Sequence, residues 1–228
     1  MMYFLVIGGF ILLLSGAEIM LRGAIGIGDK LGISKLVVGM TIVAFGTSTP
    51  EFLVYLNAAI AGVDALAIGT VVGSNISNIL LVTGVAALIM PITLEAGAFK
   101  RDGWILLVGT ALFFILAFRS EIDLFAGSLL LFYFFCFLVY SYLREKRRFD
   151  KFEGDHKQGV EVVSQNIFKL LIYLILGFTG LVYGAEILVE GGVGIARRYG
   201  ISEAAIGLTI MALGTSLPEL AATVVAAI

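Results

Sequence analysis

The amino-acid sequence predicts an all-α polytopic membrane protein in which one group of helices is repeated with inverted topology. Three observations support this fold class: an apolar composition, a series of long apolar segments and an internal repeat. Of the 228 residues, 60% are hydrophobic and only 14% are charged, and the mean hydropathy is +1.05. Soluble domains carry about 25% charged residues and 45–50% apolar ones. The composition therefore excludes soluble globular and disordered proteins.

The charge balance and the rare residues narrow the class further. The formal net charge is -2, so the chain offers no basic surface for nucleic-acid phosphates. A single cysteine, Cys136, excludes an intrachain disulfide framework and a cysteine metal cluster, and a single histidine, His156, excludes a histidine-rich metal site. The lipid bilayer is thus a predicted partner, nucleic acid is not, and no covalent cofactor is expected.

Seven apolar segments are each long enough to cross the bilayer as a helix, which takes roughly 20 residues. Polar residues punctuate the chain between them. The segments do not alternate polar and apolar residues as the strands of a membrane barrel do, so helices are predicted. The predicted spans are 3–26, 33–61, 65–91, 102–118, 122–143, 166–193 and 202–228.

The positive charges set the orientation, because Lys and Arg favour the cytoplasmic side of a membrane. The loops after spans 1, 3 and 5 share one side, and they and the adjoining span ends carry all but three of the 15 Lys and Arg residues. The three exceptions are Arg119, Arg197 and Arg198. The N-terminus is therefore predicted outside and the basic segment 144–165 in the cytoplasm. That segment is interpreted as a solvated anchor, with a regulatory or lipid-binding role as the alternative.

The chain matches itself without gaps at a constant offset, as Gly16 and Gly184 show. The shared residues are Gly, Thr, Ser, Pro and Glu, which hydrophobic bias alone does not reproduce. Five predicted spans separate equivalent positions, and an odd number reverses the direction of the chain, so the copies must run antiparallel, as in many secondary transporters. The predicted organisation is a first five-helix repeat at 1–143, a linker at 144–165 and the start of a second repeat, with two helices, at 166–228.

Each copy contains a Gly-Thr-Ser-x-Pro-Glu motif inside an apolar span. Proline lacks the N–H that an interior helical position must donate, so the spans are predicted to break near Thr47 and Thr215. The breaks free backbone carbonyls and the motifs add hydroxyls, which are oxygen types that hard cations bind. The symmetry brings Glu51 and Glu219 to one axis near mid-membrane, where two carboxylates require a divalent cation, two monovalent cations or protons. The motifs therefore predict a cation site.

Span 3 carries a second polar cluster at 69–78. Ser74 and Asn78 share a helix face, so their hydroxyl and amide oxygens can reach the same cation. Asn75 and Ser77 are placed on other faces and are predicted to bond to neighbouring helices.

These motifs resemble the sodium/calcium exchanger family of the calcium:cation antiporters, of prokaryotic type. The doubled Gly-Thr-Ser-x-Pro-Glu motif, followed one span later by Gly-Ser-Asn-x-x-Asn, carries a resemblance that extends along essentially the whole chain. It implies two inverted five-helix repeats and exchange of Ca²⁺ against Na⁺ by alternating access; some relatives use H⁺ or K⁺. The compactness of the chain is typical of prokaryotic proteins, so the plasma membrane is the expected location. The family's cation ligands carry over to Glu51, Glu219, Ala44, Thr47, Ser48, Ser74, Asn78, Ala212, Thr215 and Ser216.

Two features depart from the family pattern. Thr70 stands where the family usually has Asn, a side chain expected to orient its neighbours. The second-copy counterparts of Ser74 and Asn78 would fall beyond Ile228, the last residue of the sequence. The chain is therefore expected to lack the last three helices of the family.

Two other function classes fit less well. A cation channel usually needs identical subunits around an axis, whereas inverted duplication within one chain favours alternating access. An enzyme is not expected, because no His or Lys lies mid-span to activate a Ser or Thr nucleophile. Glu18, late in span 1, is interpreted as a helix-end carboxylate paired with a nearby arginine or with backbone, with a gate or ion-entry role as the alternative.

Overall fold

The computed structural model describes residues 1–33, 35–62, 64–93, 96–118, 122–153, 166–202, 206, 209–210 and 212–228. These residues are helical with short connections, and no strand occurs among them. The chain divides into two compact units, one formed by Met1–Pro91 with Glu161–Ile228 and the other by Ile92–Val160. The first unit therefore joins the start of one predicted repeat to the start of the other.

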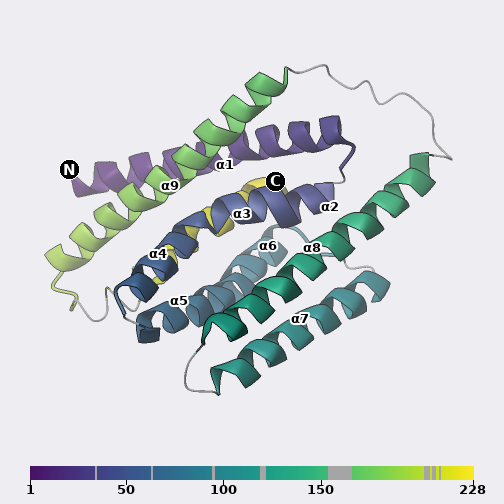
Figure 1. Cartoon of the computed structure of the whole chain (residues 1–228). Coiled ribbons are helices and arrows are strands. Elements are labelled where there is room, and N and C mark those ends of the chain that lie inside the picture. Colours follow the sequence, from purple (N-terminus) through teal and green to yellow (C-terminus); the bar gives the residue numbers. More distant parts are fainter. Residues whose placement is uncertain are drawn as a thin grey trace. The chain divides into compact units, whose positions relative to one another are not determined.

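The first unit holds both copies of the repeated motifs (Figure 1). The described residues of predicted spans 33–61 and 202–228 form series of short helical pieces rather than single helices. The elements of this unit are α1 (Met2–Leu31), α2 (Lys35–Val38), the π-helix η1 (Gly39–Val43), α3 (Ala44–Thr47), α4 (Thr49–Ile60), α5 (Asp64–Ser77), the π-helix η2 (Asn78–Val82), α6 (Thr83–Ile89), α9 (Ile167–Arg198), α11 (Ala212–Gly214) and α12 (Leu217–Ala227).

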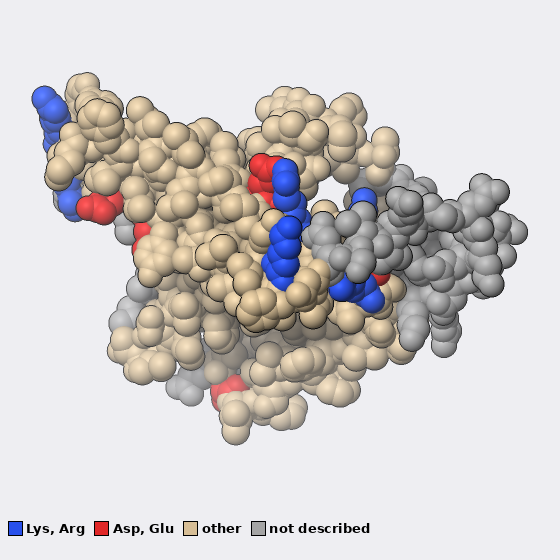
Figure 2. All heavy atoms as spheres, turned by 90° about the horizontal axis from the view of Figure 1, so that it is seen from above, with Lys and Arg blue, Asp and Glu red and all other residues tan. Residues whose placement is uncertain are grey.

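Long apolar helices dominate the part of the chain that the structure describes. By length and composition, four helical stretches within it could cross a membrane: Met2–Leu31, Ile68–Ile89, Leu124–Arg144 and Ile167–Arg198. Many of their large apolar side chains are exposed, and charged residues are sparse on the face shown in Figure 2. Such surfaces suit contact with lipid.

Helices α1 and α9 pack backbone to backbone through glycines. A Cβ added to Gly9 would lie 2.6 Å from the backbone N of Leu188, one on Gly16 2.6 Å from that of Leu181, and one on Gly23 2.7 Å from that of Leu174. Only glycine permits this approach. Residue numbers fall along α9 as they rise along α1, so these equivalent helices run antiparallel. The predicted inversion of the two copies is confirmed for this pair.

The two copies also share their local backbone geometry. Helix α1 is followed by Gly32 and helix α9 by Gly200, and both glycines adopt the left-handed conformation, with φ of 63° and 74°. This conformation is accessible to glycine at little steric cost and ends helices. The π-helical turn η1 recurs at 209–210 in the second copy. The sequence repeat is thus a structural repeat as well.

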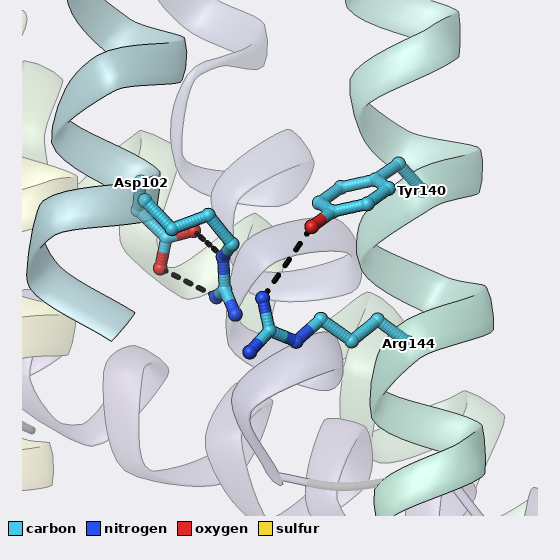
Figure 3. Close-up of polar contacts among 4 residues, drawn as sticks. Asp102, Tyr140 and Arg144 are labelled. Carbon is cyan, nitrogen blue, oxygen red and sulfur yellow. Dashed lines mark hydrogen bonds and ion pairs between the residues drawn. The ribbon is translucent and has the colours of Figure 1, made fainter. Parts of the chain in front are cut away.

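The second unit consists of α7 (Ala96–Ala117) and α8 (Leu124–Glu153). The hydroxyl of Tyr133 on α8 donates to the carbonyl of Ile105 on α7 at 2.6 Å. Figure 3 shows polar side chains of the same unit, where Asp102 pairs with the adjacent arginine and Arg144 donates to Tyr140.

Helix α8 runs ten residues beyond the end predicted for span 5 at 143. The predicted linker 144–165 therefore begins as helix, because the Arg, Glu and Lys residues that open it have high helix propensity. Its remainder, 154–165, lies outside the described residues.

Candidate functional site

The two motif-bearing spans break at equivalent serines. Ser48 separates α3 from α4 with φ of -88° and ψ of 4°, and Ser216 precedes α12 with φ of -91° and ψ of 3°. A proline follows within the first turn of each new helix, where its missing N–H does no harm. The predicted interruptions near Thr47 and Thr215 are confirmed.

These breaks place Glu51 and Glu219 in the first turns of α4 and α12. The two carboxylates lie close enough for their charges to interact. Helix N-termini favour an acidic side chain by about 0.3–1 kcal/mol, whereas a buried carboxylate without a partner costs several kcal/mol. The helix ends alone therefore cannot hold both charges, and the pair suits a cation.

The burial of the two carboxylates differs. Glu51 is 2% exposed, and neither of its carboxylate oxygens has a hydrogen-bond partner among the described residues. Glu219 is half-buried, and its Oε1 accepts a hydrogen bond of 2.7 Å from the hydroxyl of Ser48. This bond joins the break of the first copy to the acid of the second. Its counterpart is missing, because the buried hydroxyl of Ser216 has no partner in the described structure.

Around the break of the first copy, two residues donate hydrogen bonds to the same backbone carbonyl. The hydroxyl of Thr47, a buried side chain, donates to the carbonyl of Ala44 at 3.3 Å. The same carbonyl accepts the backbone N–H of Ser48 at 3.0 Å. Ala44 therefore has little capacity left for a cation in this conformation. In the second copy, Ala212 opens α11 and Thr215 is half-buried.

The span 3 cluster contributes from α5 and η2. The amide oxygen of Asn78 is buried without a partner among the described residues, and η2 packs against α12, the helix of Glu219. The hydroxyl of Ser74 lies 2.8 Å from that of Tyr55 on α4. The structure thus gathers Glu51, Glu219, Ser48, Ser216, Thr47, Ser74 and Asn78 from elements that contact one another.

Two residues of this region were not among the predicted ligands. Tyr55 follows Glu51 by one helical turn, a spacing that could have flagged it. Ser77 was predicted to bond to a neighbouring helix, but its buried hydroxyl has no partner in the described part of the chain. Asn75 bonds to the Val71 carbonyl of its own helix at 2.8 Å rather than to a neighbour.

The donor set is that of a hard-cation site. No three His, Cys, Asp or Glu side chains come together within the described residues in a way that could hold a metal ion. Two carboxylates with hydroxyl, amide and carbonyl oxygens remain, which are the ligands that Ca²⁺ and similar cations prefer.

Glu18 lies apart from these oxygens. It pairs with Arg22 one turn along α1, which confirms the predicted partner. Its predicted place at a helix end is wrong, because α1 continues to Leu31. The pair lines an open cavity of about 930 Å³ between α1, the α2–η1 segment and α12. Ala222 and Thr223, about one turn after Glu219, line the same cavity.

The family model described as sodium/calcium exchanger protein matches residues 1–143 and 169–228. The chain belongs to the sodium/calcium exchanger family. It is 34% identical to the sodium/calcium exchanger MaX1 of Methanosarcina acetivorans, over 96% of this chain and 72% of that protein. It is 36% identical to the putative antiporter CaxA of Alkalimonas amylolytica, over 96% of this chain and 69% of that protein.

A solved structure has the same fold as this exchanger-family chain. A structure of the sodium-calcium exchanger NCX_Mj superposes with a TM-score of 0.77 at 31% identity, and the match covers 99% of this chain and 72% of that one. The fold is thus that of an all-α transporter, and the chain is an integral membrane protein.

Proposed function

We propose that this protein is a secondary antiporter that exchanges Ca²⁺ against Na⁺ across a membrane by alternating access. The observation that carries the proposal is the meeting of Glu51 and Glu219 at two helix breaks of antiparallel copies. Their joint charge of -2 matches one Ca²⁺. The names of the relatives MaX1 and NCX_Mj support the choice of ions.

The proposed ligands divide by the charge that they supply. Glu51 and Glu219 neutralise the divalent ion, and neutral oxygens complete its shell or hold Na⁺ at neighbouring positions. The neutral oxygens come from Thr47, Ser48, Ser74, Asn78, Thr215, Ser216 and the carbonyls of Ala44 and Ala212. Because Ala44 already accepts two hydrogen bonds, the α3–α4 break must rearrange before that carbonyl can bind a cation.

The proposed setting is the prokaryotic plasma membrane, with the N-terminus outside and the 144–165 segment in the cytoplasm. The proposed organisation is the one that the repeat implies, with repeats at 1–143 and 166–228. The two compact units of the structure cut across this division, because α1 and α9 belong to different repeats and pack together. No enzymatic activity is proposed.

The function is tested with the purified protein in sealed vesicles. An outward Na⁺ gradient should drive Ca²⁺ uptake that saturates with Ca²⁺, and reversing the gradient should drive release. A channel would instead pass Ca²⁺ without Na⁺ and without saturation. Uptake driven equally by a K⁺ or H⁺ gradient would assign another counter-ion, and no coupled uptake at all would reject the antiport.

A further inference from the structure

We propose that Tyr55 is a positioning residue of the cation site, which holds the hydroxyl of Ser74 where a cation can bind it. The inference rests on the proposed antiport function and deepens it, because Tyr55 lies outside the motifs that predict the ligands. Tyr55 lies on α4 and Ser74 on α5. A single contact between their side chains thus ties the helix of Glu51 to the helix of the span 3 cluster.

One placement of the hydrogens satisfies both contacts of Ser74. The hydroxyl oxygens of Tyr55 and Ser74 are 2.8 Å apart, and Ser74 also donates to the carbonyl of Val71 at 3.3 Å. A serine hydroxyl has one hydrogen and two acceptor positions. When the hydrogen of Ser74 points to Val71, Tyr55 must be the donor to Ser74. One lone pair of Ser74 is then left for a cation.

The contact lies beside the cation site. Tyr55 is half-buried, and its hydroxyl is within electrostatic reach of both Glu51 and Glu219. It follows Glu51 by one turn, so both side chains project from the same face of α4. A change at Tyr55 therefore acts within reach of the two carboxylates.

The two hydrogen bonds of the Ser74 hydroxyl lead to different helices, one to Val71 on α5 and one to Tyr55 on α4. A serine inside a helix ordinarily turns back to a carbonyl three or four residues earlier, and the bond from Ser74 to Val71 is long at 3.3 Å. The shorter contact to Tyr55 draws the hydroxyl towards α4. Without the tyrosine hydroxyl, Ser74 should settle onto its own helix, and its free lone pair should leave the site.

The test compares Tyr55→Phe, Ser74→Ala and the double variant in vesicles, with the concentrations of Ca²⁺ and Na⁺ at half-maximal flux as the readout. Tyr55→Phe keeps the ring and removes only the hydroxyl. For each ion that Ser74→Ala affects, Tyr55→Phe should raise this concentration about fivefold, the factor that one neutral hydrogen bond supplies. The maximal rate should change less. The double variant should be no worse than Ser74→Ala, because Tyr55 acts through Ser74.

Tyr133→Phe is the matched control. It removes an equivalent hydroxyl, which bonds to Ile105 at 2.6 Å in the second unit, so it should lower the melting temperature without changing the ion dependence. The proposal is overturned if Tyr55→Phe behaves like this control, or if its effect adds to that of Ser74→Ala.

A Ca²⁺ titration by calorimetry separates the two proposals. If the wild type shows no Na⁺-coupled flux, the antiport fails, while the Ca²⁺ affinities of the same variants still decide the role of Tyr55. An unchanged Ca²⁺ and Na⁺ affinity in Tyr55→Phe would reject that role whatever the flux.

Discussion

The two copies of the cation motif have the same backbone but different side-chain partners. The break residues Ser48 and Ser216 agree in φ and ψ to within a few degrees. Yet Ser48 donates a hydrogen bond to one oxygen of Glu219, whereas Ser216 bonds to neither oxygen of Glu51. The hydroxyl of Ser216, both oxygens of Glu51 and the second oxygen of Glu219 are buried without partners among the described residues. Local sequence thus repeats the helix break, and the packing around it makes the two acids unequal.

This difference means that the surroundings of Glu51 stabilise its carboxyl group less than those of Glu219 do. Its carboxyl group is removed from solvent and has no hydrogen bond among the described residues to offset the loss of hydration. Glu219 is half-buried, and its Oε1 accepts a hydrogen bond from Ser48 while its Oε2 is buried without a partner among the described residues. A bound cation therefore relieves Glu51 more than Glu219, although both charges are needed to neutralise a divalent ion.

The largest expected effect is on transport by Glu51→Gln, which keeps the shape of the side chain and removes one charge. Ca²⁺ flux should fall about 100-fold or more, because losing one partner of a buried charge pair costs about 3–5 kcal/mol. The measurement is Na⁺-driven Ca²⁺ uptake in vesicles. Asp29→Asn, the same chemical change at an exposed position on α1, should keep normal flux. Normal flux in Glu51→Gln would remove Glu51 from the site.

A smaller effect should separate the two acids by stability. Without Ca²⁺ or Na⁺, Glu51→Gln should raise the melting temperature, because the amide cannot carry the charge that burial disfavours; the gain is about 1 kcal/mol, the low end of the cost of an unsatisfied buried polar group. Glu219→Gln should gain less, since one oxygen of Glu219 already accepts a hydrogen bond from Ser48, which the amide oxygen can keep. Thermal unfolding of both variants in a chelator tests this order. Equal gains would show that the two environments are equivalent.

The smallest effect concerns the two serines. Ser48→Ala removes the hydrogen bond to Glu219 and should cost about 1 kcal/mol of cation-free stability. Ser216→Ala removes a buried hydroxyl without a described partner, so it should cost nothing or stabilise the protein slightly. Both variants should bind Ca²⁺ more weakly, because each loses a proposed ligand. Thermal melts and Ca²⁺ titrations of the two variants test these expectations. A larger stability loss in Ser216→Ala than in Ser48→Ala would show that Ser216, not Ser48, has the stabilising contact.

The sequence by itself determined the helical class, the repeat, its inversion and the position of the helix breaks. Each of these follows from local or periodic features. Each motif proline lacks the N–H that would donate to the helix backbone one turn earlier. The glycines recur at one offset in both copies. The count of spans between the copies determines their relative direction. These features do not depend on which side chains pair between neighbouring helices.

Only the tertiary structure decided how the polar groups pair. The bonds from Ser48 to Glu219 and between Tyr55 and Ser74 join residues far apart in the chain or on different helices. They depend on how closely the helices approach, and hydrogen bonds weaken steeply when the geometry departs from the ideal. Helix approach is set by packing, such as the glycine contacts of α1 with α9. An equivalent pair of motifs could therefore be read from the sequence, whereas the inequality of Glu51 and Glu219 could not.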